Sequence, residues 1–311
     1  MTRPADPTGP ERGPADPAGP QRGRVEVVRA GALTTVQDLG RPGHAHLGVP
    51  RSGALDMPAH RRANRLVGNP DEAATLETTV NGCAVRADRP VVAAVTGAPC
   101  AVTVDGRPAP WGAPVRVPAG AVLELGAAQG GLRCYLALAG GIDVEPVLGS
   151  RSADLLSGLG PAPLSAHDTL PLGAPHGPAF DADTMPWPAP PAELVLSVLL
   201  GPRDGWFTDD APRLLATGPY TVSAASNRIG LRTEGPALRR AVDGELPSEG
   251  MVLGAVQVPP DGRPVIFLAD HPTTGGYPVI GVVPEPQLAA AAQAVPGTPV
   301  RFLPVRGNGG G

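Results

Sequence analysis

The chain has 311 residues and a net charge of −4, and 42% of its residues are hydrophobic. That length can form one large β domain or two smaller ones that share an interface. The arginines form no run interleaved with aromatic residues, which excludes a broad electrostatic surface for nucleic acid. No apolar stretch approaches the roughly 20 residues that span a bilayer, and no apolar secretory segment opens the chain. We therefore expect a cytoplasmic protein with neither nucleic acid nor a membrane as partner.

Glycine and proline dominate the composition. The chain contains 42 glycines and 41 prolines but only 3% aromatic residues. Both residues interrupt helices, and both are tolerated by short strands joined through tight turns. The composition therefore predicts a mainly β protein with a few short helices.

All 25 basic residues are arginine, a bias that genome composition is enough to explain. The lack of lysine still excludes three kinds of functional site on this chain. A Walker-type phosphate loop, a pyridoxal Schiff base and a carried biotin all need a lysine. A bound anion must therefore be held by arginine, by backbone N–H groups or by a metal.

The sequence predicts no metal site. Cys83, Cys100 and Cys134 are far apart and lack a metal-binding spacing, so we expect buried, reduced thiols. His44 and His46 are separated by one residue, but no carboxylate, histidine or cysteine completes a ligand set at a telling distance.

Proline-rich segments predict the domain organisation. Residues 1–22 contain a degenerate repeat with almost no large apolar side chain, and we expect a disordered tail there. A glycine-rich tail is expected at 306–311. Between them, residues 23–305 form the folded part, with two β subdomains that meet near the proline-rich stretch 155–192.

The predicted elements alternate short strands with three helices. The first helix covers 56–66, with Asp56 as N-cap, Pro58 in the first turn and Gly68 at the stop. Two further helices are expected at 209–215 and 288–294. The predicted strands are 25–28, 91–95, 102–104, 115–117, 122–125, 134–138, 194–200, 251–258, 265–268, 279–283 and 300–305.

Three polar clusters interrupt this scaffold. The first contains Gln37, Asp38, Arg41, Ser52 and Asp56 among turn-forming glycines. The glycines leave room for a ligand to approach Arg41. The alternative is an irregular surface loop in which Asp56 only caps a helix.

The second cluster is Asn227, Arg228 and Arg232, with Gly230 between the arginines. Two arginines beside glycine N–H groups can hold a carboxylate or a phosphate. The alternative is a solvated pair with Glu234 as the salt partner.

The third cluster follows an apolar strand that ends at residue 268. Its polar and turn-forming residues are Asp270, His271, Thr273, Thr274, Gly275, Gly276 and Tyr277. Active-site groups often lie where a rigid strand ends in such a loop. Asp270 could orient His271 or act as a base, and the backbone that follows could stabilise an oxyanion or phosphate. The alternative is a turn capped by Asp270 with an incidental histidine.

Several segments, in the same order, resemble one family. They are TTVQDLGRPG, VPRSGALD, ANRLVGN, LAGGID, SNRIGLRTEG and VLGAVQVPPDGRPVIFLADHPTTGGYP, within a resemblance from Val25 to Leu303. The family is the carboxyltransferase-like family of the C-type 5-oxoprolinase subunit, the KipA regulatory protein and part of the urea carboxylase carboxyltransferase domain. The resemblance implies a cyclophilin-like β-barrel with a second β subdomain. His271 stands where glutamine is expected in many members.

What the resemblance implies for function is one component of an ATP-dependent 5-oxoprolinase. Such an enzyme uses ATP to open a small lactam, and Mg can accompany the ATP. It consists of this type of chain together with a KipI-type (B-type) subunit and a third subunit. On this hypothesis the catalytic residues are Asp270, His271, Thr273 and Thr274. The substrate- or phosphate-binding residues are Arg41, Ser52, Asn227, Arg228, Arg232, Gly275, Gly276 and Tyr277.

Two other functions stay open. The chain could be a component of a biotin-dependent carboxyltransferase of the urea carboxylase type, with biotin carried by a partner because this sequence has no lysine. It could also be a non-enzymatic regulator that binds a KipI-type kinase inhibitor.

Overall fold

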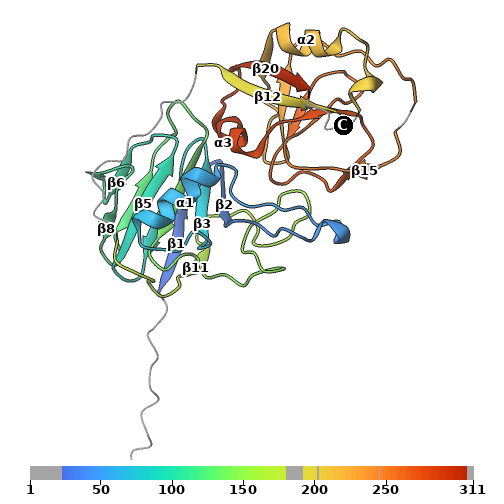
Figure 1. Cartoon of the computed structure of the whole chain (residues 1–311). Helices are drawn as coiled ribbons and strands as arrows, with labels where there is room; N and C mark the ends of the chain where they lie inside the picture. Colours follow the sequence, from blue (N-terminus) through green and yellow to red (C-terminus); the bar gives the residue numbers. More distant parts are fainter. Residues whose placement is uncertain (1–22, 180–191, 202, 245, 307–311) are drawn as a thin grey trace, which may run out of the picture.

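The computed structural model describes residues 23–179, 192–201, 203–244 and 246–306, which form two β units (Figure 1). The first unit, residues 23–179, is called the sandwich, and the second, from residue 192 to residue 306, is called the barrel. The predicted tail 1–22, residues 307–311 of the second tail and part of the predicted connection lie outside the described residues.

The sandwich consists of two antiparallel sheets. One contains β1 (Arg24–Arg29), β4 (Ala84–Ala87), β6 (Val102–Val104), β7 (Arg107–Ala109), β9 (Val122–Leu125) and β11 (Thr169–Pro171). The other contains β2 (Leu33–Gln37), β3 (Thr75–Thr79), β5 (Val91–Gly97), β8 (Val115–Val117) and β10 (Arg133–Leu138). Their orders are β11-β1-β4-β9-β6-β7 and β2-β3-β10-β5-β8.

The two sheets share one apolar core. On β9, Leu123 and Leu125 are buried while Glu124 between them is exposed, as expected for a strand with one buried face. They join a cluster that includes Leu76 of β3 and Leu136 of β10. Burial of these side chains holds the two sheets face to face.

The second unit is a closed barrel of seven strands in the order β12-β19-β16-β17-β14-β13-β20. The strands are β12 (Leu194–Leu200), β13 (Tyr220–Val222), β14 (Gly230–Glu234), β16 (Ala255–Gln257), β17 (Val265–Phe267), β19 (Val279–Val282) and β20 (Pro299–Arg306). Only β12 and β20 pair in parallel among these neighbours. Two-residue strands β15 (Glu249–Gly250) and β18 (Thr274–Gly275) pair outside the barrel.

Three α-helices and two 3-10 turns occur in the described residues. They are α1 (Met57–Leu66), α2 (Ala211–Thr217), α3 (Glu285–Gln293), η1 (Ala45–Leu47) and η2 (Asp204–Trp206). The predicted cap of the first helix is present, since the Asp56 carboxylate accepts a hydrogen bond from the Ala59 N–H at 3.0 Å. The predicted fold class, mainly β with a barrel, a second β unit and a few short helices, is confirmed.

The structure differs from the predicted organisation at two places. Residues 169–171, inside the expected connection, form β11, which pairs with β1 as the edge strand of its sheet and so belongs to the sandwich. The predicted strand 251–258 is reduced to β16, because residues 253–254 form a turn before it.

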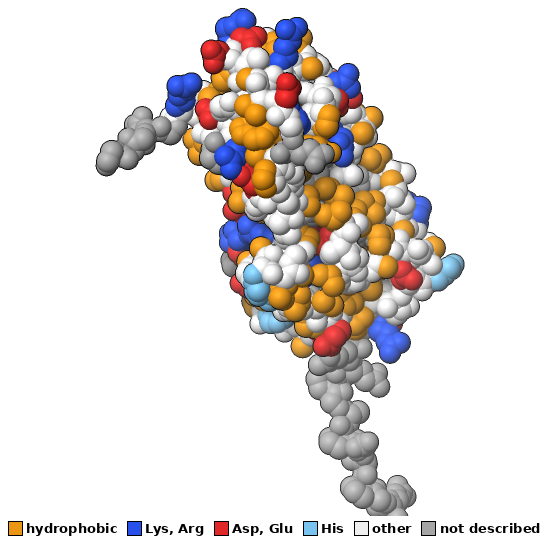
Figure 2. All heavy atoms as spheres, turned by 90° about the vertical axis from the view of Figure 1, so that its right-hand side faces the viewer, with side chains coloured by type: hydrophobic (Ala, Val, Ile, Leu, Met, Phe, Trp, Pro, Cys, Tyr) orange, Lys and Arg blue, Asp and Glu red, His pale blue; other side chains and the backbone are white. Residues whose placement is uncertain are grey.

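None of the described helices is long and apolar enough to cross a membrane. Figure 2 shows acidic and basic side chains mixed over the barrel half of one face.

Candidate functional site at the junction of the two units

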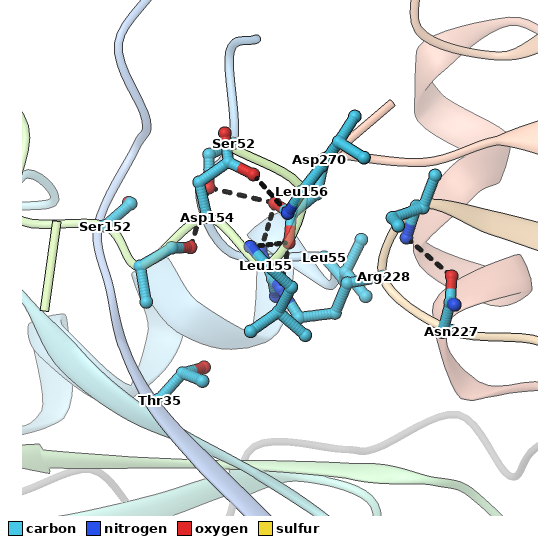
Figure 3. A network of polar contacts seen from close by, with 12 residues as sticks. Thr35, Ser52, Leu55, Ser152, Asp154, Leu155, Leu156, Asn227, Arg228 and Asp270 are labelled. Atoms are coloured by element: carbon cyan, nitrogen blue, oxygen red, sulfur yellow. Dashed lines mark hydrogen bonds and ion pairs between the residues drawn. The ribbon is translucent and has the colours of Figure 1, made fainter. Parts of the chain in front are cut away.

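The two β units meet through a buried network of charged side chains. Arg228 precedes β14 of the barrel and Asp270 follows β17, while Glu77 lies in the middle of β3 of the sandwich. All three are at most 1% exposed. Figure 3 shows Arg228 and Asp270 side by side, with Ser52 and Leu155 next to the carboxylate.

Arg228 is the centre of this network. Its Nε and Nη2 donate to the two oxygens of Asp270 at 2.9 and 3.0 Å. Its Nη1 donates to Glu77 Oε1 at 2.5 Å, and Nη2 also donates to the Gly53 carbonyl at 2.7 Å. Burial alone would lower the pKa of Arg228, but Glu77 and Asp270 outweigh burial and raise it. Arg228 therefore cross-links the barrel to the sandwich as a permanent cation.

Asp270 also binds groups of the sandwich. Ser52 Oγ lies 2.9 Å from Asp270 Oδ1, and the Leu155 N–H donates to Oδ2 at 3.1 Å. With Arg228, four contacts surround the carboxylate. Such a carboxylate positions its neighbours and has no lone pair directed at a substrate. This geometry argues against the expected role of Asp270 as a base.

Glu77 joins the same network to the sandwich core. Its Oε2 accepts hydrogen bonds from the Leu55 N–H at 3.0 Å and from the Tyr135 hydroxyl at 2.8 Å. Burial would raise the pKa of Glu77, but the guanidinium groups of Arg228 and Arg133 outweigh it and hold that pKa below its usual range. Glu77 is therefore ionised, and two arginines balance the two buried carboxylates.

A second connection runs through Gln293 at the end of α3. Its Oε1 accepts from the N–H groups of Leu132 and Arg133 at 3.1 and 2.9 Å. Its Nε2 donates to Asp56 Oδ2 at 2.8 Å and to the Arg133 carbonyl at 3.0 Å. Leu55, next to Asp56, is buried in the barrel core although it belongs to a sandwich loop. The two units are thus fixed to one another at several points.

Arg41 of the first predicted cluster is buried, at 1% exposure, within the sandwich. It donates to the carbonyls of Val147 and Ser152, and burial lowers its pKa. Its Nη1 has no hydrogen-bond partner among the described residues. Arg41 holds the 147–152 segment in place, and its burial means that the guanidinium is not exposed as the predicted anion site requires.

The two arginines of the second predicted cluster do not share a site. Arg232 is exposed on β14, because Leu231 and Thr233 occupy the buried positions of this strand. Arg228 lies before the strand, where the chain turns into the junction. Asn227 is exposed, and its Oδ1 accepts from the N–H groups of Ile229 and Gly230, so it stabilises the turn. A phosphate pinched between Arg228 and Arg232 is not compatible with this arrangement.

The third predicted cluster is also divided. Asp270 and His271 are buried at the junction, whereas Thr274 is exposed in the β15–β18 pair. Tyr277 is 44% exposed, and the guanidinium of Arg240 lies 5.8 Å from its ring centroid. Thr273 precedes β18, Gly275 ends it and Gly276 follows it, and all three are partly buried. Thr274 and Gly275 pair with Gly250 and Glu249, so their backbone belongs to a two-stranded sheet and not to one continuous loop with Asp270.

His271 is a buried ring whose orientation is fixed by its neighbours. Its ring stacks on Phe267 with centroids 5.8 Å apart, and Nδ1 lies 2.8 Å from the Pro272 carbonyl. Nδ1 therefore carries the proton of the neutral ring, and Nε2 is left as an acceptor. Burial lowers the pKa of His271, which keeps the ring neutral at pH 7.

Four network residues were not predicted from the sequence: Glu77, Arg133, Tyr135 and Gln293. A signal existed for Glu77, an acid in the middle of a strand of sequence TLETT, and for Arg133, a charge at the start of the buried strand RCYLAL. A charged residue in a buried strand needs an opposite charge. The sequence does not show which distant residue supplies it.

A cavity of about 280 Å³ adjoins the network at the junction. It is lined by residues of the 51–61 segment, by Leu253, Leu268 and Ala269 of the barrel, and by the first turns of α3. Ser52 lies both at this cavity and in the network. Among the described residues, no group of three or more His, Cys, Asp or Glu side chains is arranged to hold a metal ion.

The comparisons with known proteins agree with this architecture. Residues 47–304 match the family model described as "Carboxyltransferase domain, subdomain A and B". The chain is 39% identical to the C-type subunit of 5-oxoprolinase from Escherichia coli (strain K12) over 286 residues, covering 90% of each protein.

Two solved structures show the same fold. The structure of TTHA0988 has a TM-score of 0.82 and 38% identity, and the match covers 96% of this chain and 60% of that one. The urea amidolyase of K. lactis has a TM-score of 0.84 and 30% identity, and the match covers 93% of this chain and 19% of that one. In both proteins the matching part is one portion of a longer chain.

Proposed function

This chain belongs to the carboxyltransferase domain family, and on that premise we propose that it is one component of an ATP-dependent 5-oxoprolinase. The observation that carries the proposal is the 39% identity to the C-type subunit of a 5-oxoprolinase over 90% of both proteins. The complex would open the lactam of 5-oxoproline to glutamate together with a KipI-type subunit and a third subunit, in the cytoplasm.

The proposed reaction needs ATP because a lactam is a poor electrophile. Resonance stabilises the amide, so water attacks it slowly at neutral pH. Coupling to ATP hydrolysis supplies the free energy: one water adds to the carbonyl carbon as the ring C–N bond breaks, and a second water is consumed as ATP yields ADP and phosphate. The ring nitrogen gains a proton and becomes the amine of glutamate.

The two arginines of the second predicted cluster do not form an ATP phosphate site. All three guanidinium nitrogens of Arg228 donate to Glu77, Asp270 or Gly53, and Arg232 is exposed on β14, outside this network. The sequence contains no lysine to replace them. We therefore assign ATP binding, with any Mg, to a partner subunit, and derive no step of this chain from it.

Within this chain, His271 is the side chain best placed to move a proton. Its Nε2 is the acceptor of a neutral ring whose orientation is fixed by Phe267 and by the Pro272 carbonyl. Asp270 and Arg228 position His271, because their hydrogen bonds fix the loop from which His271 extends. His271 thus takes the proton-transfer role, and Asp270 becomes a positioning residue.

A component of a urea carboxylase is the second candidate. The TM-score of 0.84 to the K. lactis urea amidolyase favours it. In that case biotin would have to be carried by another chain or domain, since this sequence offers no lysine.

Reconstitution separates the two functions. The chain would be co-expressed with the subunits encoded beside it, and ATP hydrolysis by the purified complex would be measured with 5-oxoproline and with urea. Stimulation by 5-oxoproline alone supports the proposal. Stimulation by urea that requires a biotinylated carrier supports the second candidate, and tight assembly without turnover points to a regulator.

A further inference from the structure

The junction cavity is a second feature of the interface, beside the ion network. Its volume of about 280 Å³ lies just below the range of roughly 300–1,000 Å³ that holds drug-sized ligands. It is built by both units, since residues 51–61 face α3 across it. A site of this size suits a molecule smaller than a drug.

The walls of the cavity are mostly apolar. The uncharged lining residues are Ser52, Ala54, Leu55, Met57, Pro58, Leu253, Leu268, Ala269, Pro286, Leu288 and Ala289. The Ser52 hydroxyl is already bonded to Asp270 and to the Ala153 carbonyl. Such walls favour binding of a small, compact ring that carries few polar groups.

The charged lining residues are Arg51, Arg61 and Glu285, which leave one positive charge in excess. Arg51 is neutralised by Glu285, with Nη1 and Oε1 2.9 Å apart. Arg61 lies 3.8 Å from Asp71, beyond hydrogen-bond distance, because Asp71 is held by two hydrogen bonds from Arg65 at 2.8 and 2.7 Å. Arg61 thus forms a long ion pair with an Asp71 that it shares with Arg65, and among the described residues its guanidinium makes no hydrogen bond, so its donors are available to a ligand.

We infer that this cavity binds a small monocarboxylate, with Arg61 pairing with the carboxylate and the apolar walls holding the ring. Guanidinium groups bind carboxylates through charge-assisted, often bidentate hydrogen bonds. Resting on the proposed function, the ligand is 5-oxoproline, a five-membered lactam with one carboxylate. Neutral urea has no carboxylate with which Arg61 could form such a charge-assisted pair.

Calorimetric titration of the full chain with 5-oxoproline tests the inference, and 2-pyrrolidone, the same lactam without its carboxylate, is the control ligand. Arg61→Gln is expected to raise the Kd for 5-oxoproline about tenfold, as for the loss of one hydrogen bond to a charged group, and to leave 2-pyrrolidone unchanged. Glu285→Gln, which frees Arg51, is expected to lower the Kd. Arg213→Gln on α2 removes an equal charge far from the cavity and is the matched control.

The possible results separate this inference from the proposed function. An assembled complex that turns over 5-oxoproline with the same KM in wild type and Arg61→Gln overturns the inference and leaves the proposed function standing. A complex without turnover overturns the proposed function, while binding that depends on Arg61 in the titration still supports the carboxylate site. Absence of 5-oxoproline binding by both the chain and the complex overturns the inference.

Discussion

Arg228 of the barrel donates to Glu77 of the sandwich at 2.5 Å, and both side chains are 1% exposed. This pair ties the two β units together, with Asp270 on the other edge of the guanidinium. A buried ion pair of this kind contributes little net stability when it is intact, but the loss of one partner leaves uncompensated charge in the interior. The network therefore fixes the relative orientation of the two units and contributes little to the free energy of unfolding.

Arg228→Met is expected to destabilise the chain by about 3–5 kcal/mol, because Glu77 and Asp270 lose their common partner. Urea denaturation measures the loss. The surface arginine Arg263, paired with Glu234 at half exposure, is the matched control, and Arg263→Met is expected to cost less than about 1 kcal/mol. Equal losses in the two variants would refute a central role for Arg228.

Gln293→Ala is expected to cost about 2–3 kcal/mol and to loosen the junction, because it leaves buried donors and acceptors of the sandwich without partners. The side chain of Gln287 on the same helix bonds to Ser197, so its contacts among the described residues stay within the barrel and Gln287→Ala serves as control. Limited proteolysis of the native protein provides the second readout. Faster cleavage between the units in the Gln293 variant alone is predicted, and identical digestion patterns would contradict it.

His271 makes the stability of the fold depend on pH. Burial lowers its pKa in the folded state below the ordinary value of 6.5, so the unfolded chain binds more protons as the pH falls. The stabilisation is complete above about pH 6.5 and is lost progressively below it. The free energy of unfolding, measured between pH 5 and 8, should fall less steeply in His271→Gln than in wild type.

The exposed His176 supplies the control for this measurement, since it lies on the surface of the sandwich. His176→Gln should reproduce the wild-type profile. A wild-type profile in His271→Gln would show that the ring of His271 is not kept neutral by burial. The buried His60 is present in all these variants and does not affect the comparison.

Cys83 should resist alkylation in the native protein. It is fully buried in the sandwich core, and burial raises the pKa of its thiol to about 12. At pH 8 the thiol is therefore protonated and inaccessible to iodoacetamide. Peptide mapping by mass spectrometry should detect alkylated Cys83 only after unfolding in urea, and labelling at the same rate in both states would be inconsistent with this core.

Local chemistry made much of the fold predictable. Neighbouring residues alone predicted three features: the Asp56 cap, the apolar run of β12 and the alanine-rich α3. The strand β3 was not predicted because its TLETT sequence is polar, and only the buried junction explains why such a strand lies in the interior. Strand propensity depends on the neighbours that a strand meets after folding.

The site was predictable only in part. Arg228, Asp270 and Ser52 were predicted from the sequence, and the structure brings them together. Glu77 was not, because it is 151 positions from Arg228 and pairing over such a distance leaves no local pattern. The grouping of Arg232 with Arg228 was wrong, because the alternation of a strand turns Arg232 outward.

The fate of the lactam ring tests the proposed function most directly. Isotopically labelled 5-oxoproline would be incubated with ATP and the complex reconstituted from this chain and its partner subunits, and the products quantified by mass spectrometry. We predict labelled glutamate in amounts equal to the ADP formed, with no product when this chain is omitted. A complete complex that consumes ATP in the presence of urea and a biotinylated carrier, but leaves 5-oxoproline intact, would contradict the account.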